Sequence, residues 1–556
     1  MTRNFTIQNA DEGTAGRVRQ SWRPRLWALL SGAAWGAVVV RATPLNPLRV
    51  DWLRVGDLSS AYVNLMYFRQ SDWTQWPVTA LPSYGTGWST MFNEAGVVPL
   101  GILVKVFDWL LPAHFQYFGL WFLLCFALQG LLAYELFRRL GVGSICVWLG
   151  VFLLVTAPIL SFRVLNLGHH DLAAHWLILL AMVVYLEQRL QPFRLGMFLL
   201  LALSVNAYLF VLSAVVVTAH LVALGTSRLS RVPLARLARA IPIVCLPSAV
   251  GYAAFGYLSW GKGVVGVGNF SLDAAAFLAP GFGGEAFAFL GFGAVVSCFA
   301  ALTLFREADR SLVRQLAPLA TGAVLLYLVA VSNNVTIGPW SFSYPLPELA
   351  ETLRQVVRVS TRLSWLLYYF VIVVGVIGID RLTRERRATG LGVLSFVMLT
   401  QLISTLPRVV GDESGVLRKS AGGTVIQDAR WNTWAKSVDG VMVYPVFDVQ
   451  ADRDPETAKA LVLAQTLDWF SIIWWAAENN LPINFAYRSR PVADTVEREN
   501  QRLQAEFTSG RLNERAIYIT ASRDVWRPVV PQIPLSMDTV FVDGLYVIYP
   551  KDQPQR

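Results

Sequence analysis

Two acidic residues, Asp57 and Glu94, stand in a polar segment that runs from Leu48 to Lys105. Trp, Tyr, Gly and Pro surround them, a composition typical of a structured loop lying on a membrane. A carboxylate in a partly dry, aromatic-lined site can remove a proton from a sugar or other hydroxyl as that oxygen attacks. Asp57 is therefore the first candidate for a general base, and Glu94 the second. A helix cap or a solvated loop acid is the alternative for each.

A second group of candidates is Gly168-His169-His170-Asp171, with His175 four residues after Asp171. If a helix starts at Asp171, that residue and His175 share one face of it. This spacing fits a divalent metal site or a ring of hydrogen-bond donors to a phosphate. No HExxH-like pattern is present, so no cofactor is predicted, although a divalent metal stays open. For each residue taken alone, a hydrogen-bonded loop residue is the alternative.

Arginines border the apolar runs at Arg163 and in the segment 354–362, where Arg354, Arg358 and Arg362 recur at every fourth position. On a helix this spacing forms a single stripe. A guanidinium group can hold a lipid phosphate through bidentate hydrogen bonds. Contact with lipid headgroups is the alternative for the stripe.

The composition decides which kind of protein must position these residues. Of 556 residues, 54% are hydrophobic and 15% are charged, which excludes an ordinary soluble globular protein. Arg clusters at 17–25 and 384–387 adjoin apolar runs, so topology explains the net charge of +10 better than nucleic-acid binding does. All four cysteines lie within apolar runs, which argues against a disulfide framework or a zinc site.

Eleven apolar runs are predicted to cross the membrane, with every Arg-rich turn kept cytoplasmic. The first, Leu26 to Val40, is interpreted as an uncleaved signal anchor. We expect a cytoplasmic segment 1–25, a membrane domain 26–406 with an outer loop 42–115, and a periplasmic domain 407–556, in a bacterial inner membrane. The remaining runs are 116–137, 143–160, 171–188, 194–207, 209–223, 241–259, 286–304, 315–331, 363–379 and 390–406.

Two segments decide this topology. The run from Val97 to Leu111 contains Lys105 and Asp108, so it is interpreted as a helix on the outer surface. The run from 194 to 224 is too long for one span at the helical rise, and Asn206-Ala-Tyr208 interrupts it near the middle. It is therefore divided into two short helices.

The C-terminal segment, 407–556, has shorter apolar runs and more charge. Its pattern predicts strands at 441–446, 484–487, 516–520 and 539–549, and helices at 455–477 and 495–508. Alternating strands and helices argue for a small α/β domain. The predicted fold is thus a polytopic α-helical membrane protein with a C-terminal periplasmic α/β domain.

These features together resemble the GT-C superfamily of glycosyltransferases, which use lipid-phosphate sugars. The resemblance lies in a first span, a long outer loop with Gly-Asp near its start, a second acid, and a surface helix at Val98–Lys105. More narrowly, the chain resembles an uncharacterised bacterial family of that architecture. The stretches that carry this likeness are Phe115-Gln-Tyr-Phe-Gly-Leu-Trp121, Leu128-Gln-Gly130, the region from Gly168-His169 to His175-Trp176, and Arg358-Val-Ser-Thr-Arg362.

The resemblance implies transfer of a sugar from a polyprenyl phosphate or pyrophosphate to a glycan or lipid acceptor of the cell envelope, on the periplasmic side. Asp57, with Glu94 behind it, takes the place of the catalytic acid of the first loop. Glu94 is not part of an Asp-x-Asp pair, which makes an obligatory metal doubtful. The lipid phosphate leaves as an anion and needs cations. The implied phosphate-binding residues are Arg163, His169, His170, Arg358, Arg362 and Lys105.

Two other classes of function stay open. A transporter or flippase for lipid-linked glycans also has many spans and arginines at their edges. Polar residues at mid-membrane and internal repeats would favour it, and neither is evident. A membrane scaffold for envelope assembly would bind partners through the C-terminal domain and would not need Asp57.

Overall fold

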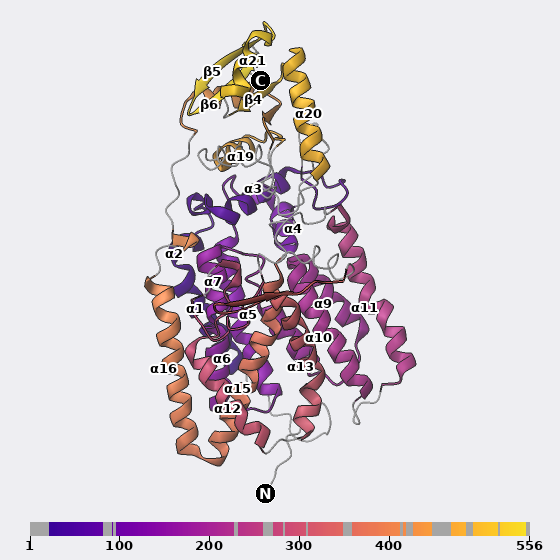
Figure 1. Ribbon diagram of the computed structural model, residues 1–556, viewed down its shortest axis with the longest axis vertical. Helices are drawn as coiled ribbons and strands as arrows, with labels where there is room; N and C mark the ends of the chain where they lie inside the picture. Colours follow the sequence, from indigo (N-terminus) through magenta and orange to yellow (C-terminus); the bar gives the residue numbers. More distant parts are fainter. Residues whose placement is uncertain are drawn as a thin grey trace.

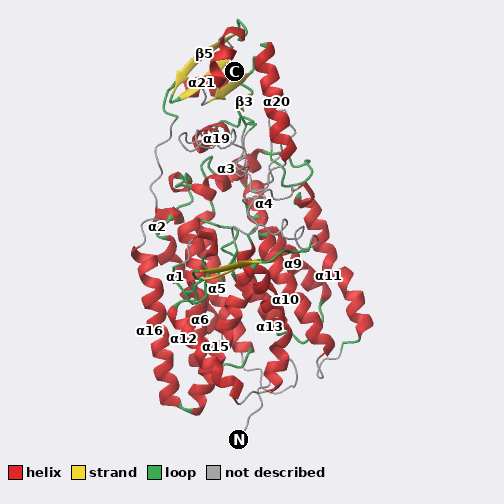
Figure 2. Cartoon of the chain, viewed as in Figure 1, coloured by secondary structure: helices red, strands yellow, loops and turns green. Residues whose placement is uncertain are grey.

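The protein is a long bundle of helices that carries a small domain with a sheet at one end (Figure 1). Strands gather in that C-terminal domain, and one further hairpin lies beside the helices (Figure 2). The computed structural model describes residues 22–81, 92, 96–226, 232–259, 271–281, 284–306, 310–347, 359–411, 415–418, 426–446, 469–484, 493–520 and 523–551.

Helical elements dominate the first 411 residues. Those before residue 190 are α1 (Arg23–Val40), α2 (Ala42–Leu45), η1 (Asp51–Leu53), α3 (Gly56–Gln70), α4 (Val98–Val106), η3 (Asp108–Leu110), α5 (Phe118–Arg139), α6 (Ser144–Val155), α7 (Pro158–Phe162), η4 (Arg163–Leu167) and α8 (Trp176–Tyr185). Those that follow are α9 (Pro192–Val205), α10 (Ala207–Thr226), α11 (Leu234–Ala254), η5 (Tyr257–Ser259), η6 (Gly284–Ala286), α12 (Phe292–Arg306), α13 (Arg310–Val331), the hairpin β1 (Asn334–Ile337) with β2 (Trp340–Ser343), η7 (Ser360–Ser364), α15 (Trp365–Glu385) and α16 (Arg387–Gly411).

Each of the eleven predicted apolar runs contains a helix. Among the described residues, seven helices are long and apolar enough to cross a membrane. The other four runs contain α1, α8, α9 and α12, which are shorter or less apolar, so the count of eleven spans stays a prediction. The seven are Phe118–Arg139, Ser144–Leu167, Ala207–Thr226, Leu234–Ala254, Ser311–Val331, Ser360–Glu385 and Arg387–Gly411.

The two segments that decided the topology have the predicted helices. The run from 97 to 111 forms α4, with nine residues, and the short turn η3. The run from 194 to 224 is divided at Asn206, whose backbone is extended between α9 and α10. Its side chain caps the start of α10, because the Asn206 Oδ1 atom accepts a hydrogen bond from the Tyr208 N–H at 2.8 Å.

Helices α1 and α5 approach each other closely because glycines line their contact. A Cβ atom on Gly32 would lie 2.1 Å from the Phe126 carbonyl oxygen, and one on Gly130 would lie 2.3 Å from that of Ala28. Such close backbone approach through small residues is a common way to pack helices in membranes. The contact between α1 and α5 therefore fixes the end of α1, from which the chain continues to α3.

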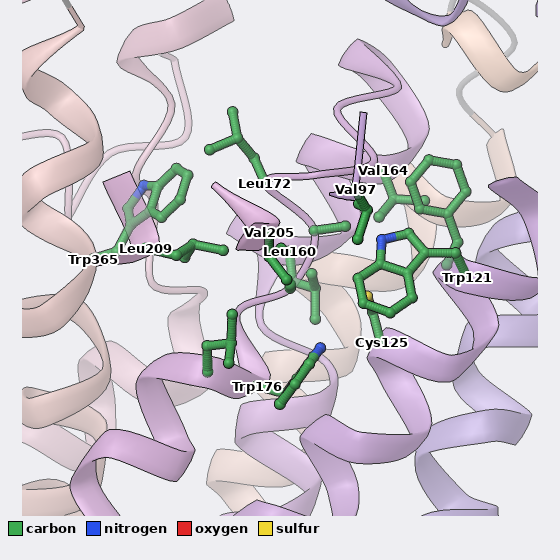
Figure 3. Close-up of a cluster of buried hydrophobic side chains, with 14 of the residues drawn as sticks. Val97, Trp121, Cys125, Leu160, Val164, Leu172, Trp176, Val205, Leu209 and Trp365 are labelled. Atoms are coloured by element: carbon green, nitrogen blue, oxygen red, sulfur yellow. The ribbon is translucent and has the colours of Figure 1, made fainter. Parts of the chain in front are cut away.

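An apolar core fills the bundle between α5, α8, α10 and α15. Figure 3 shows its aromatic members, Trp121, Trp176 and Trp365, around smaller side chains such as Leu160 and Val205. Trp365 is 1% exposed and Leu160 is fully buried. Dense packing of this kind resists displacement of the helix ends above it.

The C-terminal domain has a four-stranded sheet in the order β3-β4-β6-β5. Strands β3 and β4 are parallel, and the other neighbours are antiparallel. The predicted segment 539–549 is a hairpin rather than a single strand, because Asp543 and Gly544 both have positive φ and turn the chain. The elements are η8 (Val416–Arg418), α17 (Arg430–Ser437), β3 (Gly440–Val443), α19 (Trp469–Glu478), α20 (Ala493–Ser509), β4 (Ala516–Thr520), α21 (Arg523–Val529), η9 (Val530–Gln532), β5 (Met537–Val542) and β6 (Leu545–Pro550).

The predicted helix at 455–477 is described from residue 469 onward, as α19, and its earlier part lies outside the described residues. Most of the predicted strand at 484–487 also lies outside them. The predicted polar helix at 495–508 is present as α20.

Helix α19 packs directly on α3, so the C-terminal domain rests on the helix that carries Asp57 in its first turn (Figure 1). The Trp474 indole N–H donates a hydrogen bond to Ser59 Oγ at 2.5 Å, and its ring packs against Tyr62. The Arg54 guanidinium lies 4.3 Å from the centre of the Trp474 ring and 3.4 Å from the Glu478 carboxylate. These contacts hold the first turns of α3.

The contact between α1 and α5 can be tested with Gly32→Ala. We expect a loss of about 1–3 kcal/mol in the free energy of unfolding, because the new methyl group meets backbone atoms that cannot move aside. The matched control is Gly392→Ala in α16, where no atom lies within 4 Å of the added group. Thermal unfolding of both variants in detergent is the measurement, and equal melting temperatures would contradict the close packing.

Candidate functional site

Four predicted residues meet one unpredicted acid at the end of the bundle that faces the C-terminal domain. Asp57 lies at the start of α3, and Arg163 lies in η4. His169 follows η4, and Arg362 lies in η7 ahead of α15. The fifth residue lies in the short turn η6 before α12. We call this group the ion cluster, and its members are Asp57, Arg163, His169, Glu285 and Arg362.

Asp57 lies in the first turn of α3, and His169 holds its carboxylate. The His169 Nε2 atom is 2.9 Å from Asp57 Oδ2, so the acid is oriented by a side chain rather than serving as a helix cap. Burial raises the pKa of Asp57, but the hydrogen bond and the charge of His169 outweigh it and lower the pKa overall. The Asp57 side chain is still 48% exposed. It is therefore an ionised carboxylate that another molecule can reach.

The backbone just before His169 explains how this pair forms. Between the apolar runs 143–160 and 171–188, Arg163–Leu167 continues the helix as one turn of π-helix. Gly168 then adopts the left-handed conformation, with φ of 66°. A Cβ atom there would lie 2.7 Å from Leu58 Cδ1, so glycine lets this turn approach α3 beside Asp57.

Glu285 is the centre of the ion cluster because it pairs with both arginines. Its carboxylate accepts hydrogen bonds from Arg163 Nη1 and, at 2.8 Å, from Arg362 Nη2. Its backbone carbonyl also accepts one from Arg163 Nη2 at 2.9 Å. His169 Nε2 lies 3.8 Å from the same carboxylate.

The ionisation of Glu285 follows from these partners. Burial raises its pKa, whereas the positive charges of Arg362 and Arg163 lower it by more, so the pKa falls well below its usual range. Glu285 therefore stays negative under all ordinary conditions. Such a carboxylate is a weak base, which leaves Asp57 as the better candidate for proton removal.

The two arginines differ in how deeply they are buried. The Arg163 side chain is fully buried, and its guanidinium lies 5.2 Å from the Trp365 ring centre. The Arg362 side chain is 14% exposed and packs over the Tyr208 ring at 4.8 Å. The Tyr208 hydroxyl accepts a hydrogen bond from the Val359 N–H at 2.8 Å, which fixes the start of η7.

His170 packs against aromatic rings and makes none of the ion pairs of the cluster, although its neighbour His169 belongs to it. Its ring meets the edge of Phe118 at 4.8 Å, and its Nε2 has no hydrogen-bond partner among the described residues. Burial lowers the pKa of His170 to about 4. A neutral imidazole packed on an aromatic ring is a poor ligand for phosphate, so His170 does not fit its predicted role.

Lys105 also lies apart from the ion cluster, contrary to its prediction as a phosphate ligand. Its Nζ donates hydrogen bonds to Ser71 Oγ at 2.8 Å and to the Asp72 carbonyl at 3.3 Å, just past the end of α3. Asp57 is at the other end of this 15-residue helix, about 20 Å away. Lys105 instead ties α4 to the loop after α3.

The remaining candidates do not join the described site. Glu94 and Arg358 lie outside the described residues.

Asp171 and His175 do not share a helix face, because α8 begins only at Trp176. Asp171 accepts a hydrogen bond from Asn206, and His175 lies 2.7 Å from the Tyr369 hydroxyl. Within the described part of the chain, no three His, Cys, Asp or Glu side chains are placed to hold a metal ion.

Comparison with known proteins gives the family. A model described as a domain of unknown function, DUF6311, matches residues 28–405. The chain belongs to the DUF6311 family. A second model, the DUF6311 C-terminal domain, matches residues 430–550. No curated protein and no solved structure matches this DUF6311 chain.

Glu285 is not predicted from the sequence, because both candidate catalytic acids were taken from the polar segment 48–105. It follows Gly281-Phe-Gly-Gly and directly precedes the apolar run of α12. An isolated acid beside an apolar run, on the same predicted side as unpaired arginines, is the signal that would have found it. The ring of Phe287 stacks on Phe162 at 4.2 Å, which holds this turn against Arg163.

The low pKa of Glu285 predicts a pH-dependent contribution to stability. Because its pKa is lowered on folding, this contribution is complete above the ordinary value of 4.5 and is lost as the pH falls below it. Glu285→Gln leaves the fully buried Arg163 and the partly exposed Arg362 without this counter-ion, which costs about 3–5 kcal/mol near neutral pH. The gap in melting temperature between this variant and the wild type should therefore narrow below pH 4.5.

The matched control is Asp108→Asn, which removes the half-exposed carboxylate that pairs with Arg69. Arg69 keeps its hydrogen bonds to the carbonyls of Pro112 and Ala113, and water can reach its guanidinium group through the space of the half-exposed acid, so this variant should lose less stability than Glu285→Gln. Thermal unfolding of the three proteins from pH 3.5 to 7.5 is the measurement. If the difference in melting temperature between Glu285→Gln and the wild type is the same at every pH, the charge of Glu285 does not contribute to the stability of the protein.

Proposed function

We propose that this chain is a membrane glycosyltransferase that moves a sugar from a polyprenyl-phosphate or pyrophosphate donor to a glycan or lipid acceptor of the cell envelope. The observation that carries the proposal is the meeting of an accessible Asp-His pair with two arginines at the end of an apolar helix bundle. Base and cations at one place are what such a transfer requires.

In the proposed reaction, the acceptor hydroxyl attacks the anomeric carbon of the donor sugar. As the new carbon–oxygen bond forms, the hydroxyl proton passes to the Asp57 carboxylate, which His169 keeps in place. The bond between the anomeric carbon and the phosphate oxygen breaks, and the electron pair leaves with the lipid phosphate. No metal or other cofactor takes part in these steps as we propose them.

The departing phosphate gains negative charge and needs cations nearby. The Arg362 guanidinium is the partly exposed cation of the ion cluster, and a planar guanidinium can bind two phosphate oxygens at once. His169 Nε2 lies beside both acids, and we propose it as a further hydrogen-bond donor to the phosphate. These cations stabilise the leaving group more than the bound donor, which is how they speed the reaction.

The distribution of arginines supports a periplasmic location for the site and the C-terminal domain. Arg25, Arg138 and Arg384 lie at the ends of α1, α5 and α15 that are opposite to the ion cluster. Positive charge at helix ends favours the cytoplasmic side. With this proposed orientation, a polyprenyl donor in the membrane would lie beside the site, and the acceptor would approach Asp57 from the periplasm.

The decisive experiment compares the wild type with Asp57→Asn in turnover of a panel of polyprenyl-phosphate sugars. We expect the variant to lose about 10²–10⁴-fold in rate, because the amide cannot accept the proton. Asp51→Asn is the matched control, since it makes the same change at an exposed acid in the preceding turn η1 and should keep full activity. Radiolabelled sugar transfer measures the rates.

Each outcome of this experiment bears on a different class of function. Full turnover by Asp57→Asn would remove Asp57 from the reaction. Release of labelled donor on the other side of a vesicle, without transfer, would identify a transporter or flippase instead. Failure to bind any donor, with a fully folded protein, would favour a membrane scaffold.

A further inference from the structure

The two arginines of the ion cluster are attached to Glu285 in unequal ways. Arg163 binds both the carboxylate of Glu285 and its backbone carbonyl, the second at 2.9 Å. Arg362 binds the carboxylate alone, with one hydrogen bond of 2.8 Å and a longer one of 3.3 Å. If the Glu285 side chain turned away from Arg362, it could keep its contacts with Arg163.

Arg362 is held in position by contacts that do not depend on Glu285. Its guanidinium packs over the Tyr208 ring, and the turn η7 is fixed by hydrogen bonds from the Val359 N–H to Tyr208 and from Ser360 Oγ to the Ala330 carbonyl. Its side chain is partly exposed, whereas that of Arg163 is not. Arg362 is thus already placed to bind another anion.

The charges leave room for one such anion. Two guanidinium groups face a single Glu285 carboxylate, so this part of the cluster carries one positive charge in excess. The Nε atom of Arg163 is also buried and has no acceptor among the described residues. Asp57, the other acid of the cluster, is hydrogen-bonded to His169 and to neither arginine. A phosphate that binds Arg362 would leave Glu285 with Arg163, so that each guanidinium group has an anionic partner of its own.

We propose that Glu285 is a positioning residue that occupies the place of the donor phosphate on Arg362 and yields it when the donor binds. A carboxylate and a phosphate offer a guanidinium group the same pair of oxygen acceptors, so one can replace the other. Arg163 keeps Glu285 within the cluster after the exchange. This inference rests on the proposed function, since it takes the phosphate of a lipid-linked donor as the ligand.

The exchange predicts that Glu285 competes with phosphate. The variant Glu285→Gln keeps the shape of the side chain and removes the charge that holds Arg362. We expect it to bind undecaprenyl phosphate about tenfold more tightly than the wild type does, which corresponds to about 1.4 kcal/mol. Binding is measured on the full-length protein in phosphatidylcholine nanodiscs, by the rise in melting temperature with ligand concentration.

Three further variants make the result specific. Arg362→Gln should lose binding in both the wild-type and the Glu285→Gln background, because it removes the group that receives the phosphate. Asp108→Asn removes the carboxylate partner of another arginine, Arg69, and should bind like the wild type. Glu285→Asp retains the charge but is one methylene shorter, so it should bind a few-fold more tightly, and it replaces Glu285→Gln if that variant does not fold.

A parallel titration with inorganic phosphate separates the two sources of the ligand. If the Glu285 variants bind undecaprenyl phosphate more tightly than the wild type does, but bind inorganic phosphate equally well, the ligand is lipid-linked. If they bind only inorganic phosphate more tightly, a lipid-linked ligand is contradicted. Equal or weaker binding of undecaprenyl phosphate by both Glu285 variants, with Arg362→Gln still impaired, overturns the exchange but leaves the proposed function standing. Equal binding by the wild type and Arg362→Gln, with no sugar transfer, overturns both.

Discussion

The ion pairs of Glu285 with Arg163 and Arg362 are the interaction on which the arrangement of the site depends. They join three segments that are more than 70 residues apart from one another in the chain. Charges taken out of water are tolerated in a folded protein when they are paired and hydrogen-bonded. The turn η6 must therefore lie between η4 and η7, and the helices on either side are held in register with it.

Asp57 and His169 form a second charge pair beside the first, with a different character. Glu285 is held by two permanent cations, whereas Asp57 is held by one imidazole and is half exposed. The first arrangement suits a counter-ion that stays ionised, and the second suits a group that exchanges protons. Two acids close together thus acquire different chemistry from their neighbours alone.

The C-terminal domain contacts α3, the helix that carries Asp57. Trp474 and Glu478 hold the same helix turns that present Asp57, while Gly168 lets the His169 turn approach from the helix bundle. Asp57 is therefore set by contacts from both domains. A scaffold above a membrane domain would not need to contact this particular helix, so the contact suits a domain that shapes the site.

The sequence by itself determined the helical runs, the break at Asn206, the short helix α4 and the C-terminal elements β3, α19, α20 and β4, because hydrophobic periodicity and helix-breaking residues act locally. It also indicated Asp57, Arg163, His169 and Arg362 as residues able to do chemistry. Only the tertiary structure decided which candidates meet. It added Glu285 and placed Lys105 at the far end of α3, because pairing of buried charges depends on where distant segments pack and not on their spacing in the chain.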